Sequence, residues 1–135
     1  MASIRREFRI EARPEDVWAA VRDVGAIHTR LAPGFVVDTR LDEDARIVTF
    51  ANGVVARERI VDIDDKARRL VWAVVGGRMT HHNASLQVFA AAEGASRAVW
   101  IADLLPDELA GSIGAMVEQG SAAIKRTLER RGAEG

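Results

Sequence analysis

The feature that most constrains this chain is a run of six short strand-like segments joined by turns of two to five residues. Within these segments apolar residues tend to alternate with polar ones, which is the period of a strand with one buried face. The segments span residues 35–41, 46–51, 54–63, 69–75, 79–91 and 97–104. Connections this short favour antiparallel neighbours. Asn52-Gly53, between the second and third segments, is a strong signal for a two-residue hairpin turn.

Two helix signals flank this run of strands. A seventh strand-like segment, residues 4–11, precedes Pro14-Glu15-Asp16, where proline suits the first helical position and acids suit the first turn. We expect this first helix to end at Gly25, with one more short turn or helix over residues 26–31. The same proline-plus-acids opening starts residues 106–131, where apolar side chains recur three or four apart and predict one long helix.

The order of elements is therefore strand, helix, six strands and a long helix. A seven-stranded antiparallel sheet has one face to bury, and the long helix has one apolar stripe to bury. We therefore predict an α+β fold in which the sheet curls around the C-terminal helix and leaves a candidate ligand cavity between them.

Composition narrows the class of protein further. The chain has 135 residues, which suits a single domain over residues 1–135. A net charge of −1 gives no global basic field for nucleic acid, and the absence of cysteine excludes disulfides and thiolate chemistry. No stretch is apolar for long enough to span a bilayer, and the charged residues 1–9 lack the apolar core of a signal peptide, so we expect a cytoplasmic protein.

Several segments together resemble one superfamily over essentially the whole chain. These segments are Pro14–Trp18, Gly53 with Glu58-Arg59, Arg68–Trp72 with Gly76-Gly77, Asn83–Val88, Arg97–Trp100 and Pro106. With them the sequence is similar to the START-like, polyketide cyclase-like (SRPBCC) superfamily, whose helix-grip fold is shared with birch-pollen-type allergens and plant hormone receptors. The resemblance implies a curved seven-stranded sheet around the C-terminal helix, with one or two short helices after the first strand.

Glu58 is the first candidate for chemistry. It shares a strand face with Ala56 and Ile60, and the resemblance implies that a glutamate at this place lines the pocket. A carboxylate in an apolar cavity is costly unless it is paired. Two interpretations stay open, namely ligand hydrogen bonding or proton transfer, and an ion pair with a nearby arginine. Arg57 and Arg59 have the opposite parity and should face solvent.

Three histidines are the other titratable candidates. His81 and His82 are adjacent on a strand and point to opposite faces, with His82 on the inner face together with Ala84, Leu86 and Val88. His82 is expected to contact a ligand or to be a capped structural residue, and His28 to be a surface residue near the pocket entrance. His28, His82 and Glu58 could supply three metal ligands, but their spacing does not demand it, so we expect no metal and no cofactor.

The remaining candidates form the apolar wall. By the resemblance, Trp72 and Val74 line the cavity, and Val99, Ile101 and Asp103 point inward, which leaves Trp100 on the convex face. Gly111, Gly114 and Gly120 cost helix stability, which indicates that close approach or open volume is needed there. The further wall candidates are Ala84, Leu86, Ile113, Met116, Val117 and Gly120.

Three functions follow as alternatives. The leading hypothesis is binding or carriage of an apolar or aromatic small molecule, with Glu58 and His82 as its polar contacts. The first alternative is a cyclase, aromatase or dehydratase that uses Glu58 or His82 for proton transfer. The second is a partner-binding subunit with a nearly filled cavity and an exposed Trp100. The sequence leaves a homodimer open.

Overall fold

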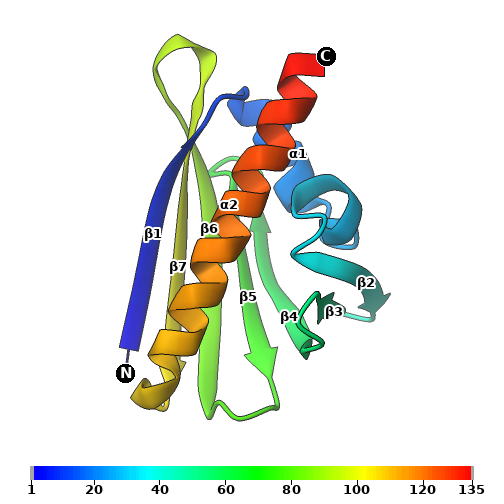
Figure 1. Cartoon of the computed structure of the whole chain (residues 1–135), viewed down its shortest axis with the longest axis vertical. Coiled ribbons are helices and arrows are strands. Elements are labelled where there is room, and N and C mark those ends of the chain that lie inside the picture. The colour runs from blue at the N-terminus through cyan, green and yellow to red at the C-terminus, as the bar shows by residue number, and fades with distance from the viewer. Residues whose placement is uncertain (1, 135) are drawn as a thin grey trace.

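A computed structural model describes residues 2–134 and shows a curved sheet with a long helix lying across its concave face (Figure 1). The predicted order of strand, helix, six strands and long helix is confirmed. The elements are β1 (Ala2–Ile10), α1 (Pro14–Arg22), η1 (Ile27–Leu31), β2 (Val36–Asp42), β3 (Ala45–Phe50), β4 (Val55–Asp64), β5 (Arg69–Val75), β6 (His81–Ala90), η2 (Ala92–Gly94), β7 (Ser96–Leu105), η3 (Asp107–Leu109) and α2 (Ala110–Glu134).

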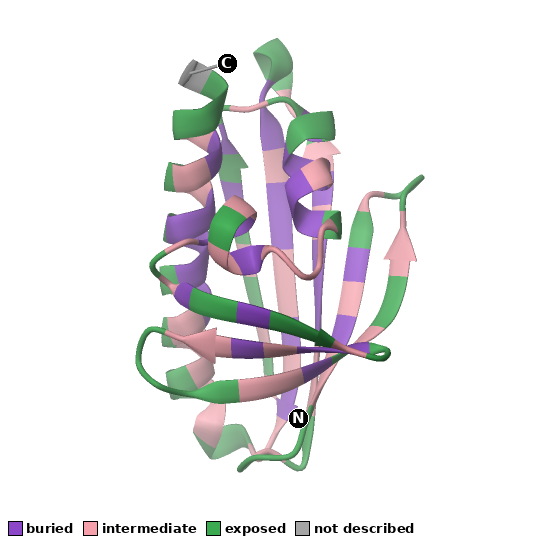
Figure 2. Cartoon of the chain, turned by 90° about the vertical axis from the view of Figure 1, so that its right-hand side faces the viewer, coloured by how far each residue is buried: buried purple, intermediate pink, exposed green. Residues whose placement is uncertain are grey.

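The seven strands form one antiparallel sheet in the order β1-β7-β6-β5-β4-β3-β2. The first strand therefore joins the last one, while β2 to β7 follow each other as hairpins. This arrangement confirms the predicted α+β helix-grip architecture. In Figure 2 the buried residues gather on the face of α2 that is turned toward the sheet.

Both helices differ from the predicted boundaries. The first helix ends at Arg22, before Gly25, because Asp23 leaves the helical region at φ −81° and ψ 76°. The long helix begins with a 3-10 turn, η3, before the α-helical part, and that part continues to Glu134 instead of ending at Arg131. The predicted short helix over residues 26–31 is η1, a five-residue π-helical turn.

The hairpin between β3 and β4 is the most consequential difference from prediction. The turn has three residues, because the amide of Phe50 donates to the carbonyl of Val54 at 2.9 Å, so the two-residue turn predicted from Asn52-Gly53 is wrong. Gly53 adopts a φ of 89°, the left-handed conformation that ends a three-residue hairpin loop. This turn length sets the register that places Arg46 directly opposite Glu58.

Helix α1 is tied to the turn between β4 and β5 by one carboxylate. Asp65 Oδ1 accepts hydrogen bonds from Trp18 Nε1 at 2.9 Å and from Arg22 Nε at 2.7 Å. The Arg22 guanidinium, followed by the Trp18 indole, lowers the pKa of Asp65. Since η1 follows α1 directly, this contact also places the segment that covers one end of the sheet's concave face.

Close packing of α2 on the sheet depends on Gly120. A Cβ atom at this position would lie 2.9 Å from the Trp100 ring and 3.0 Å from the Phe35 ring. The prediction that a glycine on this helix permits close approach is therefore confirmed for Gly120. A Cβ atom at Gly111 would meet no other atom within 4 Å, and one at Gly114 would meet only Ile4 Cδ1, at 3.9 Å.

No helix in the described part of the chain, residues 2–134, is long and apolar enough to cross a membrane.

The contact at Gly120 predicts opposite effects for two substitutions on one helix. We expect Gly120→Ala to lower the free energy of unfolding by about 1–3 kcal/mol, because the methyl group overlaps two aromatic rings. Gly114→Ala is the matched control and should raise it by up to about 1 kcal/mol through helix propensity. Urea unfolding of both variants measures the two effects, and a stabilised Gly120→Ala would contradict the packing described.

Candidate functional site

A hollow lies between the concave face of the sheet and α2. It offers about 90 Å³ of room for the centres of water-sized molecules. One water needs about 10–15 Å³ on this measure, so the hollow exceeds an ordinary packing defect. Its wall is drawn from η1, from β3 to β7, from α2, and from the start of β2 with the residue before it.

Most of the predicted wall residues meet at this hollow. The structure places nine of them there, namely Glu58, Trp72, His82, Ala84, Leu86, Ile113, Met116, Val117 and Gly120. Val74, also predicted to line it, is half-buried against the core and is not part of the wall. His28, expected near the entrance, does not line the hollow either, although its neighbour Ile27 does.

The predicted facing of β7 is wrong. Val99, Ile101 and Asp103 were expected to point inward, but Trp100 and Ala102 line the hollow instead. The register explains the reversal, because Trp100 pairs with Leu86 and Ala102 with Ala84, and directly paired residues share a sheet face.

On the opposite face Asp103 is held by polar neighbours. It accepts a hydrogen bond from the Ser3 hydroxyl and another, at 3.3 Å, from Asn83 Nδ2. An inward role for this carboxylate is therefore excluded in the described structure, and Trp100 is not the exposed convex patch that the partner-binding alternative required.

Four aromatic rings form much of the wall, and three of them were not predicted. Trp72 and Trp100 meet edge to face with ring centroids 6.1 Å apart. Phe35 and Phe50 meet in the same way at 5.3 Å. Phe50 shares strand parity with Val48, so the alternation of β3 contained a signal for it. Phe35 has the parity of Val37 and Leu41 in the predicted segment 35–41, and these two are exposed, so alternation gave no signal for Phe35.

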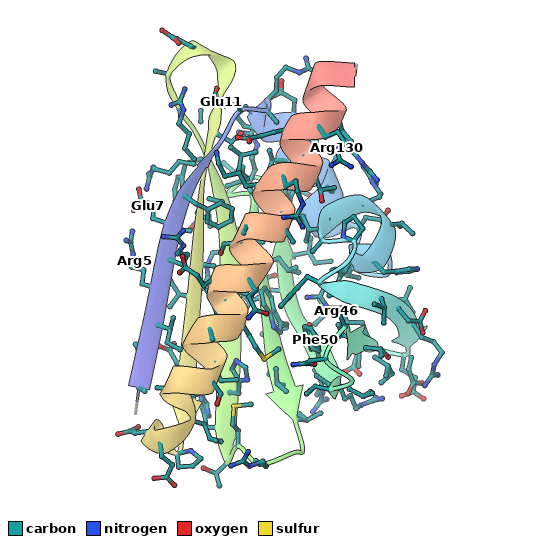
Figure 3. All side chains as sticks on the ribbon, in the orientation of Figure 1. Arg5, Glu7, Glu11, Arg46, Phe50 and Arg130 are labelled. Atoms are coloured by element: carbon teal, nitrogen blue, oxygen red, sulfur yellow. The ribbon has the colours of Figure 1, made fainter. Side chains whose placement is uncertain are left out.

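Glu58 is joined to Arg46 in a buried ion pair. Arg46 Nε donates to Glu58 Oε1 at 2.8 Å, and the two side chains are only 4% and 9% exposed. The guanidinium also lies over the Trp72 ring, 5.2 Å from its centroid, and Nη1 approaches the Val24 carbonyl at 3.4 Å. Figure 3 shows Arg46 and Phe50, both on β3, on the side of the sheet that faces α2.

The ion-pair interpretation of Glu58 therefore describes its contacts, with an arginine that the sequence reasoning missed. Arg57 and Arg59 face solvent as predicted, and they pair with Asp42 at 2.7 Å and Asp44 at 3.2 Å. Arg46 could have been found from the hairpin, since a three-residue turn places it opposite Glu58, whereas a two-residue turn shifts the register by one.

The polar wall residues share one transverse row of the sheet. Arg46 pairs with Glu58, Glu58 pairs with Val74, and the β5–β6 register continued by one residue places His82 beside Val74. With strands about 4.8 Å apart, the Cα atoms of Glu58 and His82 are about 10 Å apart. This spacing separates the imidazole from the ion pair, and no group of three metal-ligating side chains occurs among residues 2–134.

His82 is the third polar residue of the wall. Its pKa is lowered from the ordinary 6.5, first by burial and second by the neighbouring His81. Its Nδ1 is buried and has no hydrogen-bond partner within the described chain. A neutral imidazole can accept one hydrogen bond and donate one, so this ring can contact a polar group or exchange a proton.

Comparisons with known proteins agree with this architecture. Residues 1–132 match the family model described as polyketide cyclase / dehydrase and lipid transport. A solution NMR structure of a Thermobifida fusca protein is 28% identical, with a TM-score of 0.80, and the alignment covers 99% of this chain and 95% of that one. No curated protein sequence matches.

Two further solved structures are similar in fold alone, because their identities are low. An uncharacterised protein from Bacillus thuringiensis is 19% identical with a TM-score of 0.84, and the alignment covers 94% of this chain and 98% of that chain. The di-domain ARO/CYC BexL from the BE-7585A biosynthetic pathway is 14% identical with a TM-score of 0.80. There the alignment covers 96% of this chain and 47% of that one.

The buried ion pair predicts that the stability cost of changing one partner depends strongly on whether the other partner is still present. Arg46→Met or Glu58→Leu alone should cost about 3–5 kcal/mol of stability, because each leaves an unpaired charge in an apolar wall. The double variant should recover much of this loss. Asp44→Asn, which breaks the exposed pair with Arg59, should cost no more than about 1 kcal/mol. Chemical unfolding of all four proteins tests this, and additive single costs would argue against the pair.

The environment of His82 predicts a pH dependence with a definite sign. Because its folded pKa is depressed, the unfolded chain binds the proton more readily below about pH 6.5, so stability falls as pH drops through that value toward the folded pKa. His82→Asn should lack this part of the loss. An NMR titration of His82 should show a midpoint below 6.5 that rises in His81→Asn. A midpoint at or above 6.5 would contradict the burial described.

Proposed function

Because the chain belongs to the polyketide cyclase / dehydrase and lipid transport family, we propose that it binds an apolar or aromatic small molecule in the hollow between the sheet and α2. The observation that carries the proposal is the hollow itself. It survives inside an otherwise packed core, and its wall is apolar except for one ion pair and one imidazole.

The proposed energetics follow from the wall. Each Å² of apolar ligand surface removed from water contributes about 25 cal/mol, so the aromatic and aliphatic wall supplies most of the affinity. Polar groups act mainly through the cost of leaving them unpaired, so they select among ligands. In this proposal Glu58 and His82 orient the ligand, while Trp72, Leu86, Val117 and their neighbours enclose it.

The size of the hollow constrains the ligand. Its volume of about 90 Å³ is smaller than the roughly 150 Å³ of an engineered apolar cavity that takes up benzene. Binding of an aromatic ring therefore requires wall side chains to move. Ile113 and Met116, on the first turns of α2, are only half-buried, and methionine has three rotatable bonds with which to adapt.

An enzymatic role is the second candidate. The wall carries a carboxylate, a guanidinium and a neutral imidazole, a set that could move protons and stabilise a developing negative charge on a folded substrate. The family description, which includes cyclases and dehydrases, supports this alternative. The two candidates differ in one variant, because Glu58→Gln should abolish turnover in an enzyme but only change affinity in a binding protein.

The three tryptophans provide a direct test of binding. Trp72 and Trp100 line the hollow, whereas Trp18 donates its indole N–H to Asp65 outside it. We expect toluene to shift the indole N–H signals of Trp72 and Trp100 in a ¹H–¹⁵N spectrum and to leave that of Trp18 unchanged. Unchanged signals for all three, together with no small molecule co-purifying in native mass spectrometry, would refute the proposal.

A matched pair of variants tests whether the ligand binds in the hollow or on the opposite face of the sheet. Ala84→Leu adds volume to the wall and should abolish the toluene-dependent shifts while circular dichroism remains that of the folded protein. Ala73→Leu makes the same change on the opposite face of the neighbouring strand and should leave binding intact. Equal binding by both variants would place the ligand elsewhere.

A further inference from the structure

The ion pair in the wall is incompletely hydrogen-bonded. Only one bond joins its partners, from Arg46 Nε to Glu58 Oε1, and Nη1 makes a long contact of 3.4 Å with a backbone carbonyl. Within residues 2–134, Arg46 Nη2 donates no hydrogen bond and Glu58 Oε2 accepts none. A guanidinium has five N–H donors and a carboxylate about four acceptor sites, so the pair retains unused capacity of both kinds.

Neither of these two unused atoms is fully enclosed by protein atoms, so both can be reached by a molecule in the adjoining space. The side chains of Arg46 and Glu58 are 4% and 9% exposed, and both belong to the wall of the hollow. Buried charges are stable only when additional hydrogen bonds satisfy their remaining donors and acceptors. Water in the hollow can supply the missing partners, and a ligand that displaces this water binds best when its own polar groups replace those hydrogen bonds.

We propose that the ligand of this hollow carries a neutral planar group with a carbonyl oxygen beside an N–H or O–H donor, as in a primary amide or a hydroxy-carbonyl. The carbonyl accepts from Arg46, and the donor bonds to Glu58. This inference rests on the proposed binding function and names the chemistry of the ligand's polar end.

The charges of the pair disfavour ligands whose polar group is itself ionised. The pair is neutral as a whole, so a ligand carboxylate would place one oxygen against Glu58, and an ammonium group would face Arg46. A neutral acceptor–donor group matches both partners at once. Trp72, over which the guanidinium lies, and Trp100 bound the adjoining space, which suits a flat aromatic body attached to that group.

Toluene, benzamide and benzoate are the probes that test this inference, because they share one ring and differ in the polar group. For the wild-type protein we expect benzamide to bind about tenfold more tightly than toluene, with benzoate weaker than benzamide. Titrations followed by the Trp72 and Trp100 indole signals give the three dissociation constants.

Glu58→Gln should reverse the preference between the two polar probes. Its amide oxygen can still accept from Arg46, which leaves an N–H2 donor and a net positive charge facing the hollow. Benzoate should then bind more tightly than benzamide. Asp44→Asn changes the net charge by the same amount in an exposed pair and should leave the order of affinities as in the wild type.

A second variant tests the inference if Glu58→Gln does not fold. Arg46→Lys keeps the charge but removes the planar fork, so the advantage of benzamide over toluene should fall several-fold. If toluene binds but benzamide has no advantage, or if the order survives in a folded Glu58→Gln, the inference is overturned and the proposed function stands. If toluene itself does not bind, both are overturned.

Discussion

One helix cannot fill the concavity of a seven-stranded sheet, and this mismatch governs the rest of the molecule. Helix α2 offers a single apolar stripe, while the sheet curls far enough to bury apolar residues on six of its strands. At one end α1 and η1 help to close the space, and α1 is anchored there by the carboxylate of Asp65. Between them the rings of four aromatic side chains meet without closing completely, and the hollow remains.

The ion pair in the wall of this hollow loses hydration free energy on burial, and a gain in fold stability does not explain its presence there. Replacing a buried ion pair by well-packed apolar residues is often neutral or stabilising. Arg46 and Glu58 nevertheless occupy neighbouring inner positions of β3 and β4, with each charge dependent on the other. Groups of this kind are common at sites that recognise ligands, where desolvation strengthens every electrostatic contact. This is the physical reason for the proposal that the pair contacts a ligand.

Much of the fold could be predicted from the sequence, because strand alternation, turns and the apolar stripe of α2 are local signals. Alternation placed His82 on the inner face, whereas for Glu58 it gave only the residues that share its face, and the family resemblance supplied the inward direction. The facing of β7 could not be predicted in this way, since Val99 and Ile101 have one parity while Ala98, Trp100 and Ala102 have the other, and both sets are apolar. Only the pairing with β6 decides between them. Arg46 was missed for a related reason, because its partner depends on whether the turn between β3 and β4 has two or three residues.

The contact between Gly120 and Trp100 ties the choice of one residue to that of another. A side chain at position 120 would need the volume that the Trp100 indole occupies. A larger residue at one of these two positions therefore requires a smaller residue at the other. Relatives that carry a larger residue at the helix position should have a smaller one at the strand position, so that the summed volume of the two side chains stays about the same. Such paired substitutions would shift the free volume of the hollow toward the helix or toward the sheet. The shape of the hollow could then change during evolution to suit another ligand while the fold stays the same.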